Sequence, residues 1–311
     1  MLSRVADSMY WMSRYFERAD HCSRVLEANY NLMLNPSKVS NEQRWQRIAA
    51  CLGYRLDEEA VDPQTAMARM TLDAGNRASI VCCISSAREN ASQVREQISS
   101  EMWERLNQLY HEVTQSSSRH HSEADPLRLV TSIREGSYKF YGVTDQTMSH
   151  DEGWHFIQLG RFMERACAVS NLLDAHFATA DTAEDLDWVG LLASCSAFEA
   201  FCKVYTADLQ ADRVAEFLLL NAEFPYSVRH AADRMHTALE VIAEVSLVRK
   251  TNRIERIIGQ MQSSLAYAQI DEIMSQSLHK YLNGVIEQCQ DLHAAMHDIY
   301  IEYPIETAFE V

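Results

Sequence analysis

Apolar residues recur at helical spacing along most of the chain, and this spacing predicts helices joined by short polar segments. The expected helices cover residues 3–33, 41–53, 63–73, 77–115, 126–141, 150–179, 185–207, 210–220 and 224–247, with two more between 250 and 302 that are separated near Tyr267–Asp271. Ser149 and Glu152 have capping-box spacing, Gly142 is expected to end a helix, and Pro225 fits a first helical turn. Because no segment alternates Val, Ile and Thr with period two, we expect an all-α protein with no sheet.

An internal repeat divides this pattern into two halves. A shift of 147 positions places MSRYFERADHCSRVL at 12–26 over LGRFMERACAVSNLL at 159–173, and both copies contain R-x-x-E-R-A. The apolar seam of the helix also matches between the copies. The first copy has Met9, Met12, Phe16, Ala19, Leu26 and Tyr30, and the second copy has, in the same order, Phe156, Leu159, Met163, Ala166, Leu173 and Phe177. The remaining seam position is Ser23 in the first copy and Ser170 in the second. Unrelated helices share apolar spacing but rarely a charged triplet as well, so we predict a duplication.

The predicted architecture is one helical domain over 1–311, a long-helix bundle whose halves are related by a pseudo-two-fold axis. The first half covers 1–125 and the second half covers 126–311. The segment SSSRHHSEADP at 116–126 is the best internal linker, because it is serine-rich, lacks apolar periodicity and closes with a proline.

Composition supports the helical assignment and narrows the function. Nine glycines and five prolines among 311 residues are too few for a fold rich in tight turns. The net charge of −16 argues against nucleic acid and anionic membranes as partners, because both attract basic surfaces. The N-terminal residues lack a signal-peptide core and no apolar run reaches 18 residues, so we expect a cytoplasmic protein.

Eight cysteines are present without any C-x-x-C pair, and they are Cys22, Cys51, Cys82, Cys83, Cys167, Cys195, Cys202 and Cys289. We expect reduced and mostly buried thiols rather than a zinc site. The sequence contains no Walker loop and no G-x-S-x-G motif, so no cofactor is predicted and an enzyme that uses ATP on its own is disfavoured.

The repeated charged triplet is the main candidate for chemistry. In the first copy, Arg14 and Arg18 lie one helical turn apart with Glu17 beside them. In the second copy, Arg161, Glu164 and Arg165 repeat the arrangement, and aromatic residues flank both triplets. These charges are therefore expected to lie at least partly inside the protein, where a guanidinium needs an anionic partner. If the copies face each other, four arginines and two glutamates would surround one central site.

Three interpretations of this cluster stay open. The triplets can form a structural ion-pair network that fixes how the halves pack. They can bind an acidic substrate, because the planar guanidinium suits carboxylate and phosphate. Glu17 or Glu164 can instead act as a catalytic acid or base while the arginines stabilise an oxyanion.

A second set of candidates lies outside the triplets. Arg88 and Arg95 share one helix face, with Glu89 and Asn90 adjacent, and this set is either a further anion contact or a solvated surface. Supporting residues are expected at the start of the second repeat helix, namely Asp151, Trp154 and His155. No metal is predicted, because a di-iron or zinc pattern is not completed by the candidate spacings Glu152-x-x-His155, Asp233-x-x-His236 and the pair His293 and His297.

Four segments in order give a resemblance to a known family: MLSRVADSMYWMSRYFERAD, ARENASQVREQISSEMWERLN, TMSHDEGWHFIQLGRFMERA and FLLLNAEFPYSVRHA. The chain resembles the alpha-E family, also called domain of unknown function 403, over essentially its whole length. The E-R motif of that family falls on Glu17-Arg18 and Glu164-Arg165. Its usual F-P-R-S appears here as Phe224-Pro225-Tyr226-Ser227, so the arginine of that segment is missing.

The resemblance implies a bacterial, all-helical protein that works beside a circularly permuted ATP-grasp protein and a transglutaminase-like peptidase. It also implies a part in making or processing an amide-linked, peptide-like product. We therefore expect an accessory or substrate-binding subunit of an ATP-grasp-type amide ligase. The alternatives are a catalyst that uses the E-R glutamates and a purely structural scaffold, and a homo-oligomer is left open.

Overall fold

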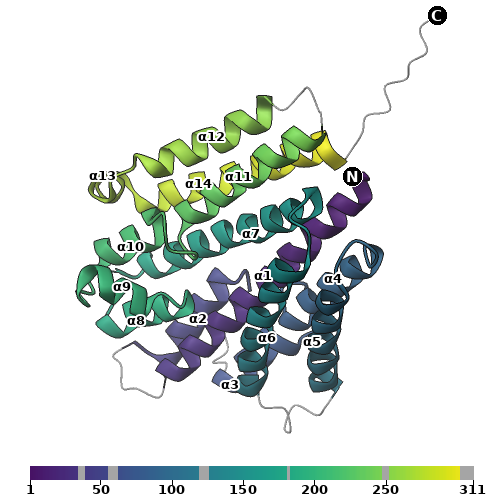
Figure 1. Cartoon of the computed structure of the whole chain (residues 1–311). Helices are drawn as coiled ribbons and strands as arrows, with labels where there is room; N and C mark the ends of the chain where they lie inside the picture. Colours follow the sequence, from purple (N-terminus) through teal and green to yellow (C-terminus); the bar gives the residue numbers. More distant parts are fainter. Residues whose placement is uncertain (34–38, 55–61, 119–125, 181–182, 247–251, 302–311) are drawn as a thin grey trace, which may run out of the picture.

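The computed structural model describes residues 1–33, 39–54, 62–118, 126–180, 183–246 and 252–301. Over these residues the regular structure is entirely helical, as predicted, and no strand is present (Figure 1). The first half contains α1 Ser3–Leu32, α2 Asn41–Cys51, α3 Pro63–Leu72, α4 Ile80–Gln93, α5 Ser100–Ser118 and α6 Pro126–Thr147. The second half contains α7 Glu152–Phe177, α8 Asp185–Ser194, α9 Phe198–Tyr205, α10 Ala211–Leu220, α11 Val228–Ser246, α12 Asn252–Ala266, α13 Ile270–Gln276, α14 Leu278–Met296 and a π-helical turn at His297–Ile301.

The single helix predicted over 77–115 is wrong, because the structure divides it into α4 and α5. Val94 leaves the helical conformation with φ −118° and ψ 25°. The hydroxyl of Ser99 then accepts a hydrogen bond from the backbone amide of Met102 at 3.2 Å and starts α5. A serine that caps a new helix competes with continuation of the old one, even where apolar spacing runs through the break.

Two further helices end elsewhere than predicted. The helix expected over 185–207 is divided into α8 and α9, because Ser196 adopts the left-handed conformation with φ 51°. The helix expected to stop near Gly142 continues to Thr147. A glycine inside a helix costs only about 1 kcal/mol relative to alanine, so packing overrides it.

The predicted starts of two helices also move. Asp151, rather than Ser149, caps α7, since its Oδ1 accepts hydrogen bonds from the amides of Gly153 at 3.0 Å and Trp154 at 3.4 Å. Pro225 precedes α11 instead of lying in its first turn. The linker predicted at 116–126 lies largely outside the described residues, although α5 extends into it as far as Ser118.

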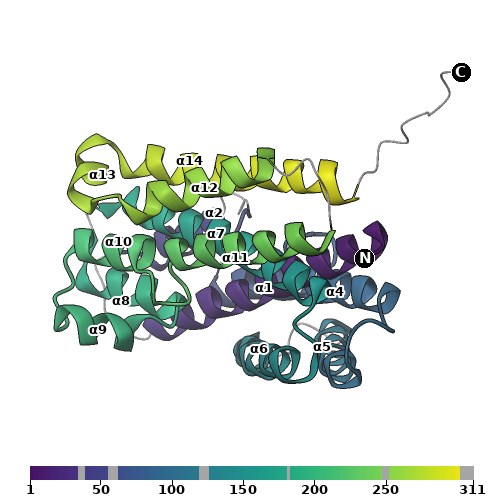
Figure 2. The same cartoon turned by 45° about the horizontal axis from the view of Figure 1, so that its top comes forward.

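The two repeat helices α1 and α7 pack directly against each other at the centre of the molecule (Figure 1). Helix α1 also packs against α4, α6 and α8, while α7 packs against α11, α14 and α2. In Figure 2, α5 and α6 lie on one side of this central pair and α12 and α14 on the other. The packing order around α1 thus parallels that around α7, and a pseudo-two-fold axis relating the complete halves stays a prediction.

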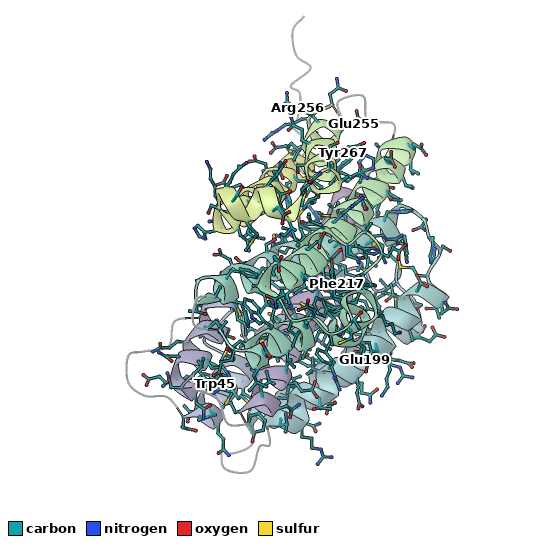
Figure 3. All side chains as sticks on the ribbon, turned by 90° about the vertical axis from the view of Figure 1, so that its left-hand side faces the viewer. Trp45, Glu199, Phe217, Glu255, Arg256 and Tyr267 are labelled. Carbon is teal, nitrogen blue, oxygen red and sulfur yellow. The ribbon has the colours of Figure 1, made fainter. Side chains whose placement is uncertain are left out.

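The predicted seam lies in the core but faces mainly the flanking elements: Phe16 meets Phe140 of α6, and Phe156 meets Tyr300. Its members are buried in both helices except for the last residue of each copy, Tyr30 and Phe177, which are half-buried. The buried apolar residues form one continuous core that includes residues of both halves. In Figure 3, charged side chains such as Glu199 and Arg256 lie on outer helix faces, whereas Phe217 lies within the core.

The eight cysteines are free thiols, five of them buried, as expected. Among the described residues, no helix combines the length and apolar character that crossing a bilayer requires.

Candidate functional site

Glu17 of α1 is enclosed by arginines of α7. Its carboxylate binds Arg165 in a two-point arrangement, with Nε to Oε1 at 2.6 Å and Nη2 to Oε2 at 2.9 Å. Arg161 approaches Oε2 at 3.7 Å, and the hydroxyl of Tyr141 from α6 donates a hydrogen bond to the same oxygen. Glu17 is 0% exposed and Arg165 is 1% exposed, so their ion pair is closed to water, while the Arg161 side chain is 22% exposed. We call this first arrangement the Glu17 centre.

Glu164 of α7 is held in the same way by arginines of α1. Arg14 donates from Nε and lies with Nη2 at 2.8 Å from Oε2, and Arg18 donates from Nε to Oε1 at 2.5 Å. Glu164 is buried, but the side chain of Arg18 is 35% exposed. We call this second arrangement the Glu164 centre.

The two E-R motifs therefore meet, and each glutamate is neutralised by the arginines of the other copy. Neither Glu17 nor Glu164 pairs with the arginine that follows it in the sequence. Each centre contains two guanidinium groups and one carboxylate, so each keeps a net charge of about +1 inside an acidic protein. The sequence analysis expected the charged triplets to come together only if the two copies face each other, and in the structure they do.

The electrostatics keep both glutamates ionised. Burial by itself would raise the pKa of Glu17, but Arg165, Arg161 and the Tyr141 hydroxyl outweigh it and lower the pKa to about 2. Burial likewise opposes ionisation of Glu164, and Arg14 and Arg18 lower its pKa below the usual value. A general base that works near neutral pH needs a pKa close to 7, so these carboxylates are poorly matched to that role.

Sequence reasoning missed a network that extends the Glu17 centre. The Tyr226 ring lies under the Arg165 guanidinium at 3.9 Å, and its hydroxyl donates to Asp20 at 2.8 Å. Asp20 in turn accepts from Arg24 Nε at 3.0 Å, and both residues are buried. The spacing of Asp20 and Arg24, four residues apart on one helix, was a signal that could have located this pair.

The candidates on α4 lie apart from both centres. Arg88 donates to Asn107 at 2.7 Å and stacks on Tyr110 and Trp103 of α5, and Arg95 also lies over Trp103, at 5.4 Å. Asn90 donates to the carbonyl of Ser86, and the carbonyl of Glu89 accepts from the hydroxyl of Ser92. These residues therefore form an arginine–aromatic surface between α4 and α5, not a part of the E-R cluster.

The candidates at the start of α7 also lie elsewhere. Asp151 serves as the helix cap, and Glu152 binds the N-terminal ammonium of Met1 at 2.7 Å. Trp154 is buried and stacks on His150 at 4.1 Å, and it also meets His155 edge-on at 5.0 Å. Burial lowers the pKa of His155. Asp151 and Glu152 line a cavity of about 490 Å³ whose lining includes none of the E-R residues.

Metal binding finds no support in the described part of the chain. Over those residues no group of three or more His, Cys, Asp or Glu side chains is placed to hold an ion. His293 instead shares a hydrogen bond of 2.9 Å between its Nδ1 and the Tyr10 hydroxyl, and His297 lies beside it.

Comparison with known proteins identifies the repeated motif. A family model named Alpha-E, described as a predicted alpha-helical domain with a conserved ER motif, matches residues 1–301. The chain is also similar to uncharacterized proteins of Mycobacterium tuberculosis (strain H37Rv) and Mycobacterium bovis, at 24% identity over 320 residues in each case. Those matches cover 95% of this chain and 36% of each relative, so the chain spans about a third of their length. No solved structure matches.

Proposed function

The chain belongs to the Alpha-E family, and from this membership and the ion pairing of both E-R glutamates we propose that it is a non-catalytic helical subunit of an amide-forming system. In this proposal the E-R motifs are the clamp that joins the two halves. The partner is a circularly permuted ATP-grasp protein, and a transglutaminase-like peptidase acts on the same peptide-like product.

The observation that carries the proposal is the pairing of both motif glutamates. A catalytic carboxylate must reach its substrate, and Glu17 is fully buried with partners on both oxygens. Glu164 is also buried and is held by two arginines. Ion pairs closed in this way fix the relative position of the two helices, which is the task of a scaffold.

The relatives support the view that this domain works as a module. In the mycobacterial proteins the matched region is about a third of the chain, so the domain there is joined to further sequence. An ATP-dependent activity requires a nucleotide site, and the sequence of this chain contains no Walker loop. A separate ligase subunit would supply it.

Co-purification tests the proposal. The tagged chain should retain a circularly permuted ATP-grasp protein from a lysate of its own organism, and the pair should consume ATP when offered an amine and a carboxylate substrate, whereas the chain alone should not. Co-purification without any such turnover, or turnover by the isolated chain, would each contradict the proposed role.

Conservative substitution separates a clamp from a catalyst. Glu164→Gln should lower the melting temperature of the chain, yet the assembled system should keep most of its turnover at a temperature where the variant is folded. A loss of turnover of a hundredfold or more with the fold and partner binding intact would assign Glu164 to catalysis instead.

A further inference from the structure

The loops that precede α4 and α11 have the same construction. Asp73 and Asn221 each accept from the amide two residues later, at 2.8 and 2.9 Å. Ser79 and Ser227 each accept from the amide three residues later, at 3.3 and 3.0 Å, and each starts a helix. Their own amides donate to Asn76 and Phe224, three residues earlier, at 3.0 and 2.9 Å. Position 78 therefore corresponds to position 226.

The two loops differ at the residue that faces the E-R cluster. In the loop before α11, Tyr226 covers Arg165, and the carbonyl of Pro225 accepts from Arg165 Nη1 at 3.0 Å. In the loop before α4, Ala78 takes the place of Tyr226 and the exposed Arg77 takes the place of Pro225. The loop before α11 thus places the Tyr226 ring over Arg165, whereas the loop before α4 carries the positive charge of Arg77 and no aromatic ring.

Cys83 links the loop before α4 to Arg18, which is the repeat equivalent of Arg165. The thiol of Cys83 interacts electrostatically with the Arg18 guanidinium. Its Sγ is 3.7 Å from the Arg77 carbonyl oxygen and 3.6 Å from the Ala78 carbonyl oxygen. Where Arg165 binds a loop carbonyl, the thiol of Cys83 contacts the loop carbonyls instead.

The consequence is visible in the exposure of the two equivalent arginines. The Arg165 side chain is 1% exposed, and the Arg18 side chain is 35% exposed. Arg18 uses Nε on Glu164, and within the described residues its two terminal amino groups have no hydrogen-bond partner. The half-buried ring of Tyr15 lies 5.7 Å from the same guanidinium.

We propose that the Glu164 centre is a binding site for an oxyanion, a carboxylate or a phosphate group, held by the terminal amino groups of Arg18 on the side where the loop before α4 carries Ala78 in place of Tyr226. The centre keeps one uncompensated positive charge, and the exposed Arg77 lies in the loop before α4, in a protein whose net charge is −16. The planar end of a guanidinium binds two oxygens of one group. In naming a carboxylate the inference rests on the proposed function, because a peptide-like substrate carries such groups.

Titration calorimetry on the isolated chain tests the site without the partner. The probes are triglutamate and inorganic phosphate at low salt, and they distinguish a carboxylate ligand from a phosphate ligand. Ala78→Tyr copies the ring that closes the Glu17 centre and removes no charge. It should weaken binding at least about tenfold, as should Arg18→Gln, which leaves the loop unchanged.

Two controls match these variants. Ala74→Tyr adds the same ring at an exposed position of the same loop, and Arg253→Gln removes an exposed arginine far along the chain. Both should bind the probes as the unmodified chain does. The inference is overturned if the unmodified chain binds neither probe, or if Ala78→Tyr and Arg18→Gln bind as tightly as their controls. Retention of the ATP-grasp partner is a separate measurement, so either proposal can fail alone.

Discussion

Gly160 of α7 faces Ser13 of α1, and these two residues occupy the same position in the two copies of the repeat. A Cβ added at Gly160 would overlap the Ser13 hydroxyl and the backbone carbonyl of Tyr10. The Ser13 hydroxyl already donates to that carbonyl at 2.9 Å. The close approach of the two helices therefore depends on one position without a side chain and one with a small side chain.

Gly160→Ala is expected to destabilise the protein by several kcal/mol. The atom it meets is backbone, which cannot turn aside, so α1 and α7 must separate and the ion pairs must lengthen. Urea unfolding followed by circular dichroism measures the change. Gly259→Ala is the matched control, because a Cβ there meets nothing within 4 Å, and it should stabilise the helix by about 1 kcal/mol. Equal effects of the two substitutions would contradict the close contact.

Glu17→Gln should cost more stability than Glu164→Gln. Without Glu17, the fully buried Arg165 loses its carboxylate, and breaking a buried pair in this way costs about 3–5 kcal/mol. Without Glu164, Arg14 and the exposed Arg18 can recover part of their hydration. The free energy of unfolding of both variants gives the order directly. The reverse order would contradict the conclusion that the Glu17 centre is more closed to water than the Glu164 centre.

Tyr141→Phe isolates one hydrogen bond of the Glu17 centre. The ring stays under Arg161, at 3.7 Å, while the hydroxyl that donates to Glu17 is removed. A hydrogen bond to a charged group contributes about 1.5–3 kcal/mol, so a loss in that range is expected in thermal or urea unfolding. Tyr267→Phe, at a residue 86% exposed, should change stability by less than about 0.5 kcal/mol.

Acid should destabilise the fold in two stages. Burial lowers the pKa of His21 to about 4 and that of His176 to about 3, so below pH 6.5 the unfolded chain binds protons that the folded chain excludes. Stability is complete above pH 6.5 and falls as the pH drops toward 4. The pKa of Glu17 is lowered to about 2, so the stability that its ionised carboxylate contributes is lost at lower pH, between about pH 4.5 and 2.

Melting temperatures between pH 7 and 4 check the first stage. His21→Leu should flatten the decline, since neither ring nitrogen of His21 has a hydrogen-bond partner within the described chain. A pH-independent melting temperature in the unmodified chain would contradict the buried neutral histidines.

The sequence predicted the all-helical class and the buried seam, because these depend on periodicity and repetition. It gave the meeting of the E-R motifs only as a condition. It did not predict Tyr226 over Arg165 or Tyr141 on Glu17, because loop and helix residues far along the chain reach those sites only in the folded molecule. Helix breaks were missed where a local cap, such as Ser99, outweighed continuous apolar spacing. Arg88 and Arg95 were predicted as a second set, either an anion contact or a solvated surface, and the sequence did not indicate their aromatic partners on α5.

Reciprocal pairing imposes a rule on how this protein can vary over time. A repeated segment usually leaves one copy free to diverge. Here, however, Glu17 forms its ion pair with Arg165 of the second copy, and Glu164 forms its ion pairs with Arg14 and Arg18 of the first copy. The glutamate and the arginine of each motif are thus neighbours in the sequence, but each is constrained by its ion-pair partner in the other half. Neither half can lose its glutamate without stranding cations in the other, so both copies must persist side by side.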